Sequence, residues 1–285
     1  MTETYHGNLN GHAVGIILKE LVRRAIVTIR NERTIFDVTQ KAGYDGEMTD
    51  VFTSADRKAQ EVYLRSLREC FPNHGIVAEE DALTIAPREG AGYFTVDPLD
   101  GTKAFIRRQS HGIGTMIALV EHGSIISAYI GDVNTQEIYG FRPNSQRVHR
   151  ITEFETAEEL RHHDRPLAEQ NILLRGPERA YSKASCDLLG QFKAWEIEGG
   201  SIGIWFARLW KREVGAVLLP PAAETPWDST PVAGIATALG YAFCQPLENG
   251  RWQPFEPNVQ TATYKRDHDL LVIHRNDLAK LGGLT

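Results

Sequence analysis

Residues 93–105 of the chain read YFTVDPLDGTKAF. The run YFTV is apolar and rich in β-formers, which predicts a buried strand. Pro98 fixes φ and lacks a backbone donor, so we expect the chain to leave the sheet there. Asp97 and Asp100 would then lie on a turn that ends at Gly101, and the residues after it can open a helical turn. Two carboxylates beside the free N–H groups of a helix start predict a site where a cation lies between acidic ligands and a phosphate.

The composition is that of an ordinary globular protein. The chain has 285 residues, of which 42% are hydrophobic and 24% charged, enough for one large core or two modest ones. No apolar run approaches the ~20 residues that span a bilayer, and the first residues do not resemble a signal peptide. We therefore expect a cytoplasmic protein without a membrane partner.

Cysteine content and charge exclude further classes. The three cysteines lie far apart and suggest neither a disulfide frame nor a zinc pair. The net charge of −6 argues against a surface that coats a nucleic-acid polymer. It still allows an anionic substrate, because bound divalent cations can invert the local field.

Hydrophobic periodicity predicts alternating helices and strands. We expect helices over residues 14–29, 53–71, 182–195, 201–212 and 227–239. We expect strands over residues 75–78, 93–96, 115–121, 124–132, 136–141, 171–175, 215–219, 241–244 and 269–273. Polar stretches predict a loop over residues 40–50 and a connector over residues 143–166.

The order of these elements predicts an α+β fold. The strands before the connector form an antiparallel meander, whereas those after it alternate with helices, which favours layers over one doubly wound sheet. We expect an N-terminal half over residues 1–150, carrying most of the acidic site, and a C-terminal half over residues 151–285.

Acidic residues recur where predicted elements begin or end: Asp56, Glu79, Glu80, Asp97, Asp100 and Asp228. Each has an ordinary structural interpretation as a helix cap, a solvated acidic loop or a tight turn. Taken together, hard oxygen ligands without convergent His or Cys predict Mg²⁺, with Mn²⁺ as the alternative ion, rather than zinc.

These motifs carry a resemblance to a known family. Residues 97–102 read DPLDGT, Trp227-Asp228 precedes a helix of small residues, and Glu79-Glu80 and Thr53-x-x-Asp56 complete the set. In order and spacing, from about residue 14 to 245, the chain resembles the inositol monophosphatase-like family of lithium-sensitive, Mg²⁺-dependent phosphatases. That family includes inositol monophosphatases, 3′(2′),5′-bisphosphate nucleotidases and some histidinol-phosphatases.

The resemblance implies a fold and a set of metal ligands. The fold would be the layered α-β-α-β-α sandwich of the inositol monophosphatase and fructose-1,6-bisphosphatase type. Two or three Mg²⁺ ions would occupy each site, and Asp97 would bridge two of them. The first ion would be held by Glu79, Asp97 and the carbonyl of Leu99, and the second by Asp97, Asp100 and Asp228.

The resemblance also implies catalytic roles. Thr102, hydrogen-bonded to Asp56, would orient and deprotonate the attacking water, and Glu79 would assist. The N–H groups of Gly101 and Thr102 would hold the phosphate. Water would attack directly and in line, without a phospho-enzyme, and inorganic phosphate would leave. The family further implies inhibition by Li⁺ and a homodimer.

Two segments depart from the family pattern. The family often has a Lys before an Asp in a mobile loop near the metals, and here Lys41 and Asp50 are the candidates at a different spacing. The helix after Asp228 ends on the single glycine Gly240, where paired glycines are usual.

Substrate choice stays open between branches of the family. Lys103, Arg107 and Arg108 resemble the nucleotidase branch, where they would suit a second phosphate, although they also fit a solvated surface. Residues 114–119 resemble the histidinol-phosphatase branch. Gly200 and Ser201 lie where the family binds ring or ribose hydroxyls, and they equally fit a capped helix start. We expect a small phosphorylated substrate of polyol or sugar type, such as inositol 1-phosphate, with a bisphosphate nucleotide next and histidinol phosphate third.

Two rival classes were compared with this prediction. Haloacid-dehalogenase-type phosphatases carry Asp-x-Asp-Gly-Thr, but Pro98 and Leu99 both separate the two aspartates here. An inactive metal- or phosphate-binding regulator would not need Thr102, Asp56 and Glu79.

Overall fold

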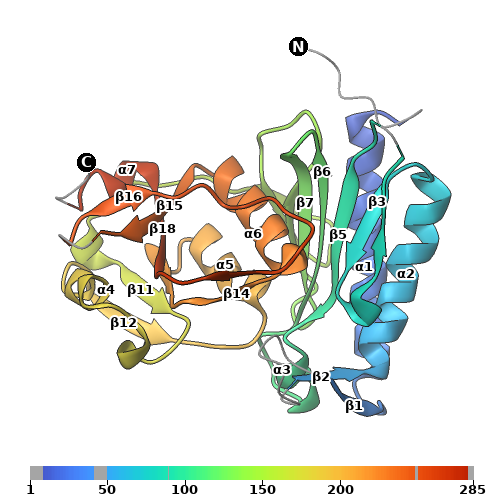
Figure 1. Ribbon diagram of the computed structural model, residues 1–285, viewed down its shortest axis with the longest axis horizontal. Coiled ribbons are helices and arrows are strands. Elements are labelled where there is room, and N and C mark those ends of the chain that lie inside the picture. Colours follow the sequence, from blue (N-terminus) through green and yellow to red (C-terminus); the bar gives the residue numbers. More distant parts are fainter. Residues whose placement is uncertain (1–8, 42–49, 89, 248–249, 282–285) are drawn as a thin grey trace.

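Helices and sheets alternate in five layers (Figure 1). The computed structural model describes residues 9–41, 50–88, 90–247 and 250–281. From one side to the other the layers are a helix pair, a sheet, a second helix pair, a second sheet and two short helices. This arrangement confirms the layered α+β sandwich that the sequence predicts.

The first sheet contains eight strands, β3 (Gly75–Ala78), β4 (Thr84–Ile85), β5 (Tyr93–Asp100), β6 (Gly114–Glu121), β7 (Ser124–Asp132), β8 (Ile138–Phe141), β9 (His149–Ile151) and β10 (Ala157–Glu159). Their order across the sheet is β10-β9-β8-β7-β6-β5-β3-β4. Strands β3 and β5 are parallel, and every other neighbouring pair is antiparallel. The predicted meander is therefore the centre of this sheet.

Helices α1 (Gly11–Glu32) and α2 (Ser54–Cys70) cover one face of the first sheet. The Asn10 side chain caps α1 by accepting a 2.9 Å bond from the backbone of Ala13. Thr53 and Asp56 form a reciprocal capping box at the start of α2. The apolar stripe of α1 is buried as its 3.6-residue period predicts.

Side chains of β6 point alternately to the two faces of the first sheet, and each face is covered by its own hydrophobic cluster. Ile117 and Leu119 pack into the cluster under α1 and α2, whereas Met116 and Ala118 pack into a second cluster. That second cluster includes helices α5 (Ile202–Trp210) and α6 (Pro226–Ala238), the middle layer of the molecule. Both faces of β6 are covered, so every residue in it is buried.

The second sheet contains six strands, β11 (Asn171–Leu174), β12 (Ala194–Ile197), β13 (Ala216–Leu219), β15 (Tyr241–Pro246), β16 (Trp252–Pro254) and β18 (Leu270–His274). Their order is β12-β11-β13-β18-β15-β16, with the first three parallel and the remaining pairs antiparallel. Helices α4 (Lys183–Leu189) and α7 (Arg275–Leu278) cover its outer face.

The remaining elements in the described ranges are short. They are β1 (Val38–Lys41), β2 (Asp50–Thr53), α3 (Thr102–Ile106), β14 (Ala222–Glu224), β17 (Tyr264–Arg266) and the 3-10 helices η1 (Glu80–Ala82), η2 (Leu167–Glu169) and η3 (Glu178–Ala180). β1 pairs with β2, and β14 pairs with β17. Most of the loop predicted over residues 40–50 lies outside the described residues. Within the described ranges, no helix combines the length and apolarity needed to cross a membrane.

Three expectations about local structure were wrong. The connector predicted over residues 143–166 contributes β9 and β10, which pair with each other and extend the first sheet beyond β8. The helix predicted over residues 182–195 ends at Leu189, and residues from Ala194 onward pair with β11 instead. Strand β5 does not end at Pro98 but passes through an irregularity and pairs again at Asp100 with Gly114. The division into halves at residue 150 stays a prediction.

Truncation of Leu18 tests the packing of α1 on the first sheet. Leu18→Ala should lower the free energy of unfolding by about 2–5 kcal/mol, because the side chain is fully buried and leaves a cavity. Ile16 lies on the same helix with 52% of its surface exposed, so Ile16→Ala should change stability by only about 0.5 kcal/mol. Urea unfolding of both variants measures the difference. Equal losses would contradict the assigned face of α1.

Candidate active site

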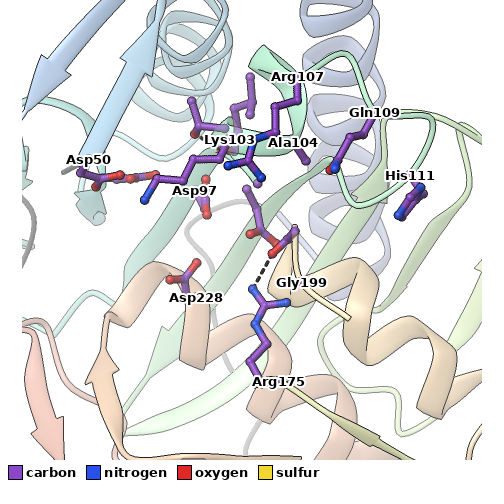
Figure 2. A pocket seen from close by; sticks show the side chains of 16 residues that line it. Asp50, Asp97, Lys103, Ala104, Arg107, Gln109, His111, Arg175, Gly199 and Asp228 are labelled. Atoms are coloured by element: carbon purple, nitrogen blue, oxygen red, sulfur yellow. Dashed lines mark hydrogen bonds between the residues drawn. The ribbon is translucent and has the colours of Figure 1, made fainter. Parts of the chain in front are cut away.

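The ends of several elements converge on one polar pocket of about 530 Å³ (Figure 2). Its floor is acidic and its walls carry basic side chains. The residues that line it are Asp50, Glu79, Asp97, Leu99, Asp100, Gly101, Thr102, Lys103, Ala104, Arg107, Gln109, His111, Arg175, Gly199, Gly200 and Asp228. The structure thus brings the acidic motifs of residues 79, 97–102 and 228 to one place.

Three aspartates form the floor of the pocket. Asp97 and Asp100 come from the end of β5, and Asp228 lies in the first turn of α6. One carboxylate oxygen from each lies within 4.8 Å of the other two. Asp97 Oδ1 is buried and accepts no hydrogen bond from the described residues. An orphaned buried carboxylate oxygen among other hard oxygens is the donor set that suits Mg²⁺.

The electrostatics of this floor are unfavourable without a cation. Burial, followed by the negative charges of Glu79 and Asp228, raises the pKa of Asp97 well above its ordinary value. Burial and Asp228 also raise the pKa of Asp100 to about 6, although hydrogen bonds from Ser201 and the α5 backbone oppose this. Each carboxylate therefore makes ionisation of its neighbours more costly. Positive charge in the pocket would relieve that cost.

Glu79, directly after β3, lines the pocket, and Lys41 pairs with it from outside the lining. The Lys41 ammonium lies 2.9 Å from Glu79 Oε1 and 3.0 Å from Glu80 Oε1. Burial raises the pKa of Glu79 to about 8, although Lys41 acts in the opposite direction. Glu80 is buried, is bonded through its backbone to Gln60, and does not line the pocket. Lys41 therefore contacts the acidic pair directly, whereas residues 42–49 lie outside the described residues.

Thr102 and Asp56 form a hydrogen-bonded pair at the start of α3. Thr102 Oγ1 lies 3.1 Å from Asp56 Oδ1 and 3.1 Å from the carbonyl oxygen of Leu99. One hydroxyl proton can serve only one of these acceptors at a time. Asp56 is fully buried, and its Oδ2 accepts from the backbone N–H and the hydroxyl of Thr53. The carboxylate is thus fixed by α2 and faces the pocket only through Thr102.

The N-terminus of α5 binds Asp100. The backbone N–H of Ile202 donates to Oδ1 at 2.9 Å and that of Gly203 donates to Oδ2 at 2.8 Å. The Ser201 hydroxyl also donates to Oδ2. Ser201 is fully buried and does not line the pocket, unlike its neighbour Gly200. Its hydroxyl therefore reaches the pocket only through Asp100.

Two glycines allow the turn after β5 and the turn before α5 to approach each other closely. Gly101 has φ +90°, and a Cβ there would lie 2.3 Å from the carbonyl oxygen of Gly112. Gly200 has φ +84°, and its Cβ would lie 2.9 Å from the same oxygen. Side chains at these positions would push the turn after β5 away from the turn before α5.

Basic side chains form two opposite walls. In Figure 2, Lys103 and Arg107 of the α3 region face Arg175, which follows β11, across the pocket. Arg108 does not line it and instead donates to the carbonyl of Thr34. Arg175 was not predicted from the sequence, where its signal was a charged residue directly after the buried run of β11. Gln109 and His111 were not predicted either.

Comparison with known proteins identifies a matching family model. The inositol monophosphatase family model matches residues 12–279. An inositol-1-monophosphatase of Rhizobium meliloti (strain 1021) is 34% identical over 90 residues, which are 32% of this chain and 33% of that relative. The chain thus spans about a third of the length of this curated relative.

Solved structures share the fold over nearly the whole chain. The extragenic suppressor protein suhB from Bartonella henselae has a TM-score of 0.73 and 18% identity, covering 94% of this chain and 96% of its own. An IMPase/NADP phosphatase complexed with NADP and Ca²⁺ has a TM-score of 0.70 and 16% identity, covering 97% of this chain and 99% of its own. At such low identity the likeness concerns the fold.

The raised pKa values predict how stability depends on pH. Between pH ~5 and ~8 the folded protein keeps on Glu79 a proton that the unfolded chain has already released, and the raised pKa of Asp97 acts in the same direction, so rising pH favours unfolding. The metal-free protein, kept in chelator, should therefore become less stable across this range. Asp97→Asn should make the dependence shallower, because it removes one buried charge. Urea unfolding at each pH measures both proteins, and stability that rises with pH would contradict the electrostatic account.

Proposed function

The chain belongs to the inositol monophosphatase family, and from that premise we propose that it is a Mg²⁺-dependent phosphomonoesterase. Its substrate would be a small polyol or sugar-type phosphate, such as inositol 1-phosphate, from which water releases inorganic phosphate. The observation that carries the proposal is the close group of Asp97, Asp100 and Asp228 in one pocket with the pair Thr102 and Asp56.

The residues present fit a divalent metal site. Glu79, Asp97 and the carbonyl oxygen of Leu99 would hold one Mg²⁺, and Asp97, Asp100 and Asp228 would hold another. The orphaned Oδ1 of Asp97 supports its role as the shared ligand. When bound, the ions would supply Lewis acidity toward the phosphoryl group and make a coordinated water more acidic. Mn²⁺, or a third ion, would use the same type of oxygen donor.

Thr102 and Asp56 would position the attacking water and move its proton. If the Leu99 carbonyl is engaged by a cation, the Thr102 proton points to Asp56, which leaves a lone pair of Oγ1 free to accept from water. Asp56 would then fix the direction of the hydroxyl through a carboxylate that α2 holds rigidly. Glu79 would assist from the first metal position, through the ion that it helps to hold.

The pocket offers donors for the phosphate. The N–H groups of Gly101 and Thr102 lie at the turn after β5, and Lys103 follows them in the lining. Preorganised donors of this kind stabilise developing negative charge on a phosphoryl group. We place Gly200 next to the leaving group and Ser201 behind Asp100. Attack would be direct, without a phosphorylated enzyme.

A bisphosphate nucleotide is the second candidate substrate. The basic side chains Lys103, Arg107 and Arg175 line the pocket, and guanidinium groups suit a second phosphate. The structural neighbour complexed with NADP supports a nucleotide substrate by analogy. Histidinol phosphate stands third, and an inactive metal-binding regulator is the non-enzymatic alternative. Lithium sensitivity, a cytoplasmic location and a homodimer stay expectations from the family.

Loss of one bridging charge tests the proposed metal site. Asp97→Asn should abolish both Mg²⁺ binding, measured by calorimetry, and phosphate release from a panel of inositol 1-phosphate, adenosine 3′,5′-bisphosphate, fructose 1,6-bisphosphate and histidinol phosphate. Asp132→Asn is the matched control, because Asp132 is a buried aspartate on β7 outside the pocket.

Near-native turnover by Asp97→Asn would contradict the bridging role. A phosphorylated Asp97 trapped from the wild-type protein would instead indicate a haloacid-dehalogenase-type reaction. Mg²⁺ binding without turnover of any ester by the wild-type protein would favour the regulator.

The hydroxyl of Thr102 should matter for turnover and not for metal affinity. Thr102→Val keeps the shape but removes the donor, so we expect kcat to fall by about 10²–10⁴-fold while Mg²⁺ affinity stays within a few fold. Thr102→Ser keeps the hydroxyl and should retain most of the rate. If Thr102→Val turned over substrate as fast as the wild type, the proposed proton path through Asp56 would be wrong.

A further inference from the structure

Arg175 is a pocket residue that no motif of the chain explains. It follows β11 directly, in the second sheet, and its side chain rises into the pocket toward Gly199 and Gly200 (Figure 2). Its Nη2 donates to the carbonyl oxygen of Gly200, and its guanidinium lies 5.6 Å from the centre of the Trp205 ring. Its Nη1 is buried and has no hydrogen-bond partner among the described residues.

This environment does not stabilise the guanidinium through a close ion pair. Burial lowers the pKa of Arg175, and the opposing negative charges of Asp100, Asp228 and Glu198 do not outweigh that shift. A partly buried cation with one orphaned nitrogen is costly to keep. Besides its contact with the Trp205 ring, the Arg175 side chain donates a hydrogen bond to the Gly200 carbonyl, in the turn before α5.

The Gly200 carbonyl belongs to the turn that leads into α5. Ser201 N donates to the carbonyl of Gly112 at 2.8 Å, which ties this turn to the first sheet. Arg175 ties the same turn to the second sheet. Ser201 Oγ also accepts from Ile204 N at 3.0 Å and so caps α5. The N-terminus of α5 is thus located from both sheets at once.

The N-terminus of α5 determines which lone pairs of the Asp100 carboxylate are free. Oδ2 accepts from Ser201 and Gly203, which uses both of its lone pairs, whereas among the described residues Oδ1 accepts only from Ile202. One lone pair of Oδ1 therefore remains for a cation. A shift of the α5 N-terminus would change which lone pair is free and where it points.

We propose that Arg175 is a positioning residue, which holds the Gly200 carbonyl so that the N-terminus of α5 presents Asp100 to Mg²⁺ through Oδ1. The inference rests on the proposed function, in which Asp100 is a metal ligand. Removal of a group that orients a metal ligand typically weakens metal affinity by about 10- to 100-fold.

The sign of the effect separates this role from simple electrostatics. A positive charge near the acidic floor repels Mg²⁺, so its removal alone would tighten metal binding. Loss of the clamp on Gly200 would weaken it. The two explanations predict opposite changes in the same measurement.

Calorimetric titration of the metal-free full chain with Mg²⁺ tests the proposal. Arg175→Met should weaken Mg²⁺ affinity by about tenfold or more. Arg175→Lys, which can still donate to the Gly200 carbonyl, should recover most of that loss. Arg107→Met is the matched control, because it removes a cation from the opposite wall and should leave affinity unchanged or tighter. Arg175→Gln repeats the test if Arg175→Met does not fold.

Three results would overturn the proposal. These are unchanged or tighter Mg²⁺ binding by Arg175→Met and Arg175→Gln, failure of Arg175→Lys to recover affinity, or equal weakening by Arg107→Met. A higher KM for adenosine 3′,5′-bisphosphate with unchanged Mg²⁺ affinity would assign Arg175 to substrate binding instead. If the wild-type protein bound no Mg²⁺ and hydrolysed no ester, the proposed function itself would be wrong. That result differs from the three results that overturn only the role of Arg175.

Discussion

Buried negative charge is the constraint on which this site depends. Asp97, Asp100 and Asp228 place oxygens within 4.8 Å of one another, and Glu79 lines the same pocket. Burial and neighbouring negative charge raise the pKa values of Asp97 and Asp100, so their ionised forms are costly unless positive charge lies among them. Lys41 offsets part of the charge on Glu79, and the α5 N-terminus offsets part of that on Asp100. Asp97 Oδ1 accepts no hydrogen bond from the part of the chain that the structure describes, so the centre of the group is where a cation would be bound most strongly.

The two sheets share the construction of this site. β5 of the first sheet supplies Asp97 and Asp100, while the middle layer supplies Asp228 from α6 and the donors to Asp100 from α5. Arg175 reaches the same turn from the second sheet. Because the pocket lies between layers, the side chains that would ligate a metal stand on rigid elements, and their charges all face one bound molecule. Gly101 and Gly200 make the contact possible, because any Cβ there would meet the Gly112 carbonyl.

The sequence predicted those parts that local chemistry determines. The order of the predicted helices and strands favoured α+β layers, whereas the five-layer sandwich was implied by the family resemblance. The acidic residues could be identified because each stands beside a strand end or a helix start. Arg175 and the α5 donors to Asp100 escaped prediction, because they act through contacts between residues about 25 and 100 positions apart. The prediction that one helix spans residues 182–195 was wrong for a similar reason. Residues from Ala194 onward pair with the distant strand β11, and this pairing outweighs their local helical pattern. Ser201 was predicted at the substrate, but its hydroxyl binds Asp100.

A crystal structure of the protein grown with Mn²⁺ and inorganic phosphate would test the central claim most directly. The account predicts two anomalous peaks about 3.5–4 Å apart in the pocket, both in contact with Asp97. One peak would also contact Glu79 and the Leu99 carbonyl, and the other Asp100 and Asp228, with the phosphate near the N–H groups of Gly101 and Thr102. A pocket without anomalous density, or a phosphoryl group bonded to Asp97, would contradict it.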